Sequence, residues 1–237
     1  MIKVENIEVW GFEHAIRGMR NPLNSWSKSD SHSCNWEMSE SCDECGKLDA
    51  DNTGVCESDR QFYCIGKNDL DLMKRLFKAG AEHRKYLRQI FVSMDITAPL
   101  YLWKEMDTYK IGTVSNSCST MHKIGAKEFT VEDFSHEHLT DGAMDALSDL
   151  IDELNLQRNY WLDTKDKCYW WGMIQLLPSS YNQRRTITMD YENVFNIIRQ
   201  RTGHKLDEWN EFVKILKTLP YVMEIGGMND KGGNEDE

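Results

Sequence analysis

Hydrophobic and polar residues alternate between residues 90 and 96, a period of two that predicts a half-buried strand. One face of this strand would carry Ile90, Val92, Met94 and Ile96. Pro99 ends the strand and can open a short helix over residues 100–110. Two further alternating stretches, residues 2–9 and 185–189, predict additional strands.

Apolar residues at helical spacing predict several helices along the rest of the chain. The first would begin at Asn68 or Asp69 and end near Gly80, and the others cover residues 141–154, 165–176, 191–202 and 206–216. Neither a regular strand–helix alternation nor a glycine-rich phosphate loop is present. We therefore expect an α+β fold with an antiparallel or mixed sheet flanked by helices. Residues 1–225 would form a single domain, followed by a disordered tail, 226–237.

The net charge of −11 lies in two segments. Residues 29–59 hold nine acidic residues and one lysine, and residues 226–237 hold four acidic residues and one lysine. An acidic chain without a basic stripe is a poor candidate for binding a nucleic-acid polymer, so we expect a small-molecule partner. We expect no membrane association and a cytoplasmic location, because no apolar run approaches about 20 residues and the start lacks a signal-peptide pattern.

Residues 28–60 form an acidic, cysteine-rich insertion with almost no periodic apolar pattern. Cys42 and Cys45 have the spacing at which two thiolates can chelate one zinc ion, and His32, Cys34, Cys56 and Cys64 lie within reach in sequence to complete a tetrahedral site. The expected ligands are Cys34, Cys42, Cys45 and Cys56. A structural zinc would explain how so polar a segment stays ordered. The alternative is a loose loop with free thiols.

Small polar side chains follow Gly112 in an uninterrupted run, which we interpret as a loop. It contains Thr113, Ser115, Asn116, Ser117, Cys118, Ser119 and Thr120. So many donors and acceptors suit the binding of a polar ligand, although a solvated serine-rich loop would look the same. Cys118 could act as a nucleophile, but no neighbouring residue forms a motif that would activate its thiol.

Two further residues have both a structural and a functional interpretation. Arg201, near the end of a predicted helix, either offsets the helix dipole or donates to a carboxylate, a phosphate or a pyrimidine edge. His83 either interacts with the free carbonyls at a helix end or faces a ligand.

Taken in order, these features resemble the flavin-dependent thymidylate synthases. The resemblance rests on His83 before the strand, Ala98-Pro99, the hydroxyl-rich run, Leu177-Pro178, and the spacing of Asn196 and Arg201. It covers residues 83–122 and 176–213, about a third of the chain. The chain departs from the family pattern where Thr108, Tyr109 and Lys110 replace an Arg-His-Arg motif, and where Asn116 and Thr120 replace a Glu and an Arg.

The resemblance implies FAD as cofactor, methylenetetrahydrofolate and NADPH as co-substrates, and C5-methylation of a pyrimidine deoxynucleotide such as dUMP. The expected catalytic residues are Arg201, Cys118 and Ser119, and the expected substrate-binding residues are Ser115, Asn116, Ser117 and Arg201. The expected cofactor-binding residues are His83, Lys110, Thr113, Asn196 and His204. The sites would lie between subunits of a homotetramer.

The departures leave two alternatives open. The chain could bind a nucleotide or flavin without turnover, or act on a different pyrimidine nucleotide. The lost phosphate contacts could also be replaced by other cations, namely Arg17, Arg20, Lys104, Arg184 or Arg185.

Overall fold

The computed structural model describes residues 2–33 and 63–228, and the chain divides into two units. Unit 1 comprises Met1–Glu8, Val92–Met189 and Asn196–Ile215. Unit 2 comprises Val9–Phe91, Asp190–Phe195 and Leu216–Glu237. That residues 1–225 form a single domain stays a prediction. Most of the predicted insertion and of the predicted tail lies outside the described residues.

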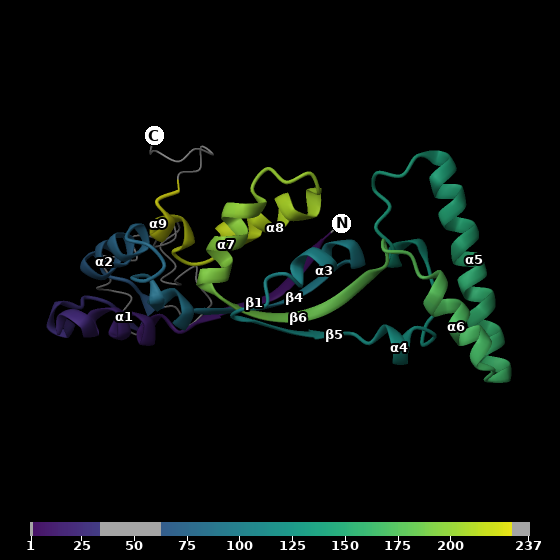
Figure 1. Ribbon diagram of the computed structural model, residues 1–237, viewed down its shortest axis with the longest axis horizontal. Helices are drawn as coiled ribbons and strands as arrows, with labels where there is room; N and C mark the ends of the chain where they lie inside the picture. Colours follow the sequence, from purple (N-terminus) through teal and green to yellow (C-terminus); the bar gives the residue numbers. More distant parts are fainter. Residues whose placement is uncertain (1, 34–62, 229–237) are drawn as a thin grey trace, which may run out of the picture. The chain divides into compact units, whose positions relative to one another are not determined.

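A four-stranded sheet forms the centre of unit 1 (Figure 1). Across the sheet the order is β1 (Lys3–Trp10), β4 (Phe91–Pro99), β6 (Asn182–Asp190) and β5 (Thr113–Ser117). β5 pairs with β6 in antiparallel fashion. Between β4 and β6, Ser93 bonds to Thr188 and Asp95 to Thr186, so the numbering rises on one strand as it falls on the other. The predicted α+β class, with an antiparallel sheet flanked by helices, is confirmed.

Helices cover one face of this sheet. Figure 1 shows α3 (Leu100–Met106), α7 (Tyr191–Arg201) and α8 (Asp207–Lys217) over that face. The predicted alternation in β4 is confirmed, because Val92, Met94 and Ile96 are all buried. They join a core that also contains Leu102, Trp103, Ile187, Met189, Ile197, Trp209 and Phe212. Burying one such side chain contributes about 1.5–3 kcal/mol to folding.

A pair of helices, α5 (Asp141–Thr164) and α6 (Lys167–Leu176), packs together at one end of unit 1 (Figure 1). Both helices were predicted from their apolar spacing. They enclose a second core of Ile124, Phe129, Phe134, Leu147, Leu154 and Met173. The short elements α4 (Thr120–Lys123) and η5 (Val131–Asp133) connect β5 to this pair. Among the described residues no helix has both the length and the apolar character needed to cross a membrane.

Unit 2 is mainly helical. It contains α1 (Phe12–Arg20), α2 (Lys67–Lys78), η4 (Lys85–Gln89) and α9 (Val222–Gly226), with the short elements η1 (Asn21–Leu23), η2 (Trp26–Lys28), β2 (His32–Ser33) and β3 (Tyr63–Cys64). α1 packs on η4, and α2 packs on α9. Gly11 precedes α1 with φ +99°, and a Cβ added there would lie 2.1 Å from the carbonyl oxygen of Gln89. Only glycine fits this close approach.

Asp69 is the polar centre of unit 2 and is fully buried. Its carboxylate accepts hydrogen bonds from Arg20 Nε, from the hydroxyls of Ser29 and Ser31, and from two backbone N–H groups. Burial raises the pKa of this carboxyl, but the bonds from Ser31, Ser29 and Arg20 outweigh burial and hold the pKa below its usual value. Asp69 therefore ties α1 and the segment after η2 to the start of α2.

Candidate functional site

Arg201 ends α7 and lies within a cluster formed by α3, α7 and α8 of unit 1. Its Nε donates to the hydroxyl of Tyr109 at 2.9 Å, and its Nη1 donates to Glu105 Oε2 at 2.8 Å. The guanidinium stacks over Trp209, 4.5 Å from the ring centre, and the Trp209 indole N–H donates to the same Glu105 oxygen at 2.9 Å. We call Glu105, Tyr109, Arg201, His204 and Trp209 the Arg201 cluster.

The cluster leaves little of Arg201 exposed, since 17% of its side chain is accessible. His204 Nε2 lies 3.2 Å from Arg201 Nη1, so the predicted cofactor histidine contacts the predicted catalytic arginine. Asn196, five residues earlier on α7, is half-buried and accepts a hydrogen bond from Arg199 at 3.3 Å. The structure therefore brings Arg201 and His204 together, while Asn196 has a different partner.

The hydroxyl-rich run is not the loop that the sequence suggested. Thr113–Ser117 form the edge strand β5, because each residue pairs with β6 in the register Thr113↔Met189 to Ser117↔Arg185. Ser115 lies opposite Ile187 and Ser117 opposite Arg185, on the helix-covered face. Asn116 lies opposite Thr186, on the other face. The three predicted substrate-binding residues in β5 are all exposed, but only Ser115 and Ser117 share a face.

Arg185 stands beside these two serines. Its guanidinium lies 4.3 Å above the ring of Trp103, its Nε donates to Gln183 Oε1 at 2.9 Å, and its Nη1 donates to Asp107 Oδ1 at 2.7 Å. Only 14% of its side chain is exposed. Nη2 makes no hydrogen bond to a described residue. A rigid, partly buried cation with one free N–H₂ next to two hydroxyls is suited to hold a phosphate.

The residues after β5 have structural contacts of their own. Cys118 is exposed, its N–H donates to the carbonyl of Arg184, and its carbonyl accepts from Gln183. Ser119 caps α4, where its hydroxyl accepts from the N–H of His122 at 3.2 Å. Lys110 is exposed between α3 and β5, and its carbonyl accepts from the N–H of Thr113. Their predicted catalytic and cofactor roles stay predictions.

His83 belongs to unit 2, in the turn after α2, and is exposed. Its neighbour Arg84 forms a bidentate ion pair with Glu192 of α7, with distances of 3.0 Å from Nε to Oε2 and 2.7 Å from Nη2 to Oε1. Arg84 also lies 5.2 Å from the ring centre of Phe77. The ion pair holds the segment that carries His83 against the first turn of α7. The predicted flavin contact of His83 stays a prediction.

The predicted zinc ligands Cys34, Cys42, Cys45 and Cys56 lie outside the described residues. Within residues 2–33 and 63–228, no group of three or more His, Cys, Asp or Glu side chains is arranged to hold a metal ion. His32, which lies within the insertion, and Cys64, which follows it, are direct partners in the pair of β2 and β3.

The site residues expected from the sequence do not include Arg185, Glu105, Tyr109 or Trp209, although Arg185 is one of the cations that could replace the lost phosphate contacts. Alternation along β6 would place Arg185 and Ile187 on one face. Its position beside Ser117, however, depends on the β5–β6 register, which requires β5 to be recognised as a strand.

No model of a known protein family matches this sequence, and no curated protein matches it. Solved structures of similar fold include two of the flavin-dependent thymidylate synthase ThyX from Helicobacter pylori, both with FAD and dUMP. Their TM-scores are 0.64 and 0.61, and in each the likeness covers 94% of this chain and 96% of that chain at 14% sequence identity. The chain thus has a ThyX-like fold along nearly its whole length.

Proposed function

We propose that this chain binds FAD and a pyrimidine deoxynucleotide and methylates C5 of the pyrimidine, in a reaction of the dUMP-to-dTMP type. The observation that carries the proposal is the likeness to ThyX structures with FAD and dUMP, over 94% of the chain. The proposal is further supported by the position of Arg185 beside Ser115 and Ser117, because these groups match the chemistry of a nucleotide phosphate.

The nucleotide would contact β5 and β6. The hydroxyls of Ser115 and Ser117 would donate to the phosphate, and Arg185 would donate from Nη2 while Trp103 and Asp107 fix its plane. Arg201 would stabilise negative charge on the pyrimidine carbonyl during attack at the ring. For this role Arg201 must exchange its bond to Glu105 or Tyr109 for a bond to the nucleotide.

The flavin side would include Asn196, His83, Lys110, Thr113 and His204. When bound, reduced FAD would supply the hydride, methylenetetrahydrofolate the one-carbon unit and NADPH the electrons that reduce the flavin. The residues of this chain would bind and orient these groups. We further propose that the protein is cytoplasmic and forms a homotetramer whose sites are completed between subunits. Light scattering on the purified protein measures the number of subunits.

A second candidate function, binding of a nucleotide or flavin without turnover, is favoured by the Arg201 cluster. Arg201 already has a carboxylate, a hydroxyl and two aromatic rings as partners. Releasing a charge-assisted hydrogen bond costs about 1.5–3 kcal/mol, which a bound substrate must offset.

The test compares two neighbouring arginines on opposite faces of β6. Arg185→Gln should weaken dUMP binding by about 10- to 100-fold, the loss expected for one charge-assisted contact. Arg184→Gln should leave dUMP binding unchanged, because Arg184 is exposed and pairs with Asp95 on the other face. Calorimetry measures both affinities, and the visible spectrum of the purified protein reports bound flavin.

Turnover is measured as dTMP formed from dUMP, methylenetetrahydrofolate, NADPH and FAD. Formation of dTMP that depends on Arg201 supports the methylation. Binding of FAD and dUMP without any dTMP would establish the second candidate instead. Equal binding losses in Arg184→Gln and Arg185→Gln would remove Arg185 from the site.

A further inference from the structure

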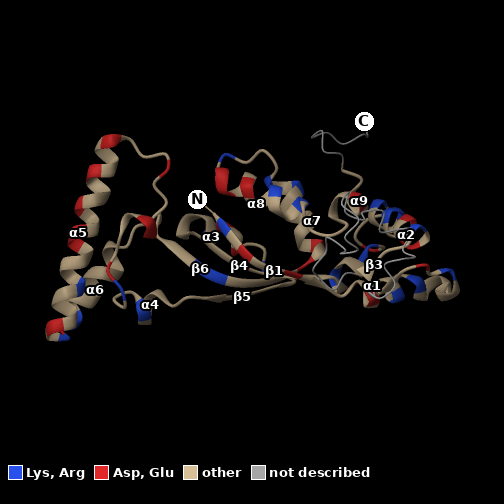
Figure 2. Ribbon diagram, turned by 180° about the vertical axis from the view of Figure 1, so that it is seen from behind, with Lys and Arg blue, Asp and Glu red and all other residues tan. Residues whose placement is uncertain are grey.

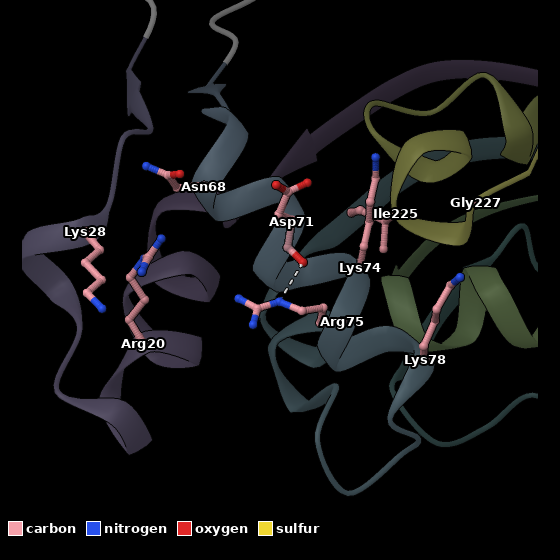
Figure 3. A pocket seen from close by; sticks show the side chains of 9 residues that line it. All are labelled: Arg20, Lys28, Asn68, Asp71, Lys74, Arg75, Lys78, Ile225 and Gly227. Carbon is pink, nitrogen blue, oxygen red and sulfur yellow. Dashed lines mark hydrogen bonds between the residues drawn. The ribbon is translucent and has the colours of Figure 1, made fainter.

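A cleft of about 700 Å³ lies in unit 2, beside α2 (Figure 3). It is lined by Arg20, Lys28, Asn68, Asp71, Lys74, Arg75, Lys78, Ile225 and Gly227. Its volume is in the range of pockets that hold small molecules, about 300–1,000 Å³. Five of the nine lining residues are cationic and one is acidic, which is unexpected in a chain with a net charge of −11.

Helical spacing explains how α2 gathers its part of the cleft. Asn68, Asp71, Arg75 and Lys78 follow one another at intervals of three or four residues, and Lys74 lies beside Arg75, so these side chains share one face. The opposite face packs Leu72 and Met73 into the core of unit 2. Figure 2 shows blue segments, which are Lys or Arg, along α2 together with red ones, which are Asp or Glu.

Carboxylates among the described residues pair with only some of the cationic side chains in this cleft. The Arg20 guanidinium is paired with buried Asp69, and Arg75 Nε donates to the backbone carbonyl of Asp71 at 3.4 Å. Lys28, Lys74 and Arg75 form no ion pair with any carboxylate in residues 2–33 and 63–228. The helix dipole favours cations in the last turn, which explains Arg75 and Lys78 but not Lys74 or Lys28.

The apolar walls of the cleft strengthen its positive electrostatic potential. Ile225 and Gly227, at the end of α9, form an apolar side of the cleft, which Lys74 also lines from α2 (Figure 3). Arg20 lines the cleft from the end of α1, and Lys28 lines it from the end of η2. Cationic groups beside low-dielectric walls concentrate the field and attract anions from solution.

We propose that this cleft binds a small anion with two or more adjacent phosphoryl groups, such as the polyphosphate of a nucleotide. Lys74, Arg75 and Lys78 donate to the phosphate oxygens from α2, with Lys28 contributing a further charge. Asn68 adds a neutral amide at the N-terminal side. The size of the cleft and the acidic remainder of the chain favour a small ligand over a nucleic-acid polymer. This site lies in unit 2 and does not depend on the function proposed for unit 1.

The experiment titrates the full chain with sodium tripolyphosphate and, separately, with ATP, using calorimetry at low and moderate salt. Both probes should bind, and binding should weaken by at least 10-fold in the double variant Lys74→Gln/Arg75→Gln. The matched control, Lys123→Gln/Lys167→Gln, removes two exposed positive charges from unit 1 and should change affinity less than 2-fold. Circular dichroism confirms that both double variants are folded.

Equal affinity for the two probes assigns the site to the phosphates alone, and tighter binding of ATP assigns it to a nucleotide. Absence of binding by the wild-type chain overturns the proposal, as does equal weakening in both double variants. Loss of ATP binding in Arg185→Gln would place the anion in unit 1 and would also overturn it. Failure of dTMP formation has no bearing on these titrations.

Discussion

Arg201 is a residue whose contacts support the fold as much as they suit a ligand. It joins α3, α7 and α8 through Glu105, Tyr109 and Trp209. The sequence predicted its position near a helix end. Its partners were not predictable, because Glu105 lies 96 residues away and its helix reaches Arg201 only through tertiary packing.

Substitution of Arg201 should therefore destabilise the ligand-free protein. We expect Arg201→Ala to lower the free energy of unfolding by about 1–3 kcal/mol, since Glu105 loses a charged donor. Arg199→Ala, on the same helix but exposed, should change it by less than about 0.5 kcal/mol. Urea denaturation without ligand measures both. Equal stability of Arg201→Ala and the wild type would show that Arg201 serves ligand binding alone.

Asp69 predicts a dependence of stability on pH. Its folded pKa lies below the unfolded value, about 3.9 for an aspartate, so its contribution is fully present above that value. The contribution is lost as the pH falls from about 4 through the folded pKa. Asp69→Asn should cost about 3–5 kcal/mol at pH 7, because Arg20 is left buried without its partner.

Unfolding measured between pH 3 and pH 7 tests this prediction. The difference between wild type and Asp69→Asn should narrow below pH 4. Asp71→Asn, two residues further along α2 and exposed, should show no such convergence. A constant difference across the whole range would contradict the assignment of a lowered pKa to Asp69.

Among the elements, long amphipathic segments were predicted well and short polar ones were not. The apolar spacing of α2, α5 and α8 and the alternation of β4 are visible locally. β5 was mistaken for a loop because Thr-Val-Ser-Asn-Ser has little apolar pattern, and its strand conformation depends on hydrogen bonds to β6. α1 was missed, although Phe12, Ala15, Ile16 and Met19 occupy one buried face.

The start of α1 offers a prediction at this scale. Gly11→Ala should lower the free energy of unfolding by about 1–3 kcal/mol or more, because it combines a positive φ with a clash against the Gln89 carbonyl. Gly142→Ala, in α5 with open space around it, should raise stability by about 0.4–1 kcal/mol. Thermal unfolding measures whether each variant has a lower or a higher melting temperature than the wild type. A neutral Gly11→Ala would mean that the turn before α1 can rearrange.

For the whole molecule, the sequence predicted the α+β class and the ThyX-like fold, and the structural likeness confirms both. The position of Arg185 beside Ser115 and Ser117 and the cationic cleft were not predicted, because each depends on segments distant in sequence. The net charge of the whole chain does not predict the charge of a local surface. A chain of −11 still presents a cleft lined by five cations, since much of its negative charge lies elsewhere along the sequence.

The pairing of β2 with β3 yields a prediction for the entire chain. Ser33 and Tyr63 are direct antiparallel partners, so a two-residue turn can connect them. Replacing residues 34–62 by Asn-Gly should preserve the fold, with a melting temperature within a few degrees of the full chain. Loss of cooperative unfolding in the shortened chain would show that the removed residues are needed for stability.

The pairing of β2 with β3 also bears on the length of the chain between them. Because Ser33 and Tyr63 are direct partners in that pair, the number of residues that joins them does not set the register of β2 against β3. A chain with a shorter or longer segment at this position would therefore keep the same partners in β2 and β3, and the sequences of β5, β6 and α7 lie outside the change.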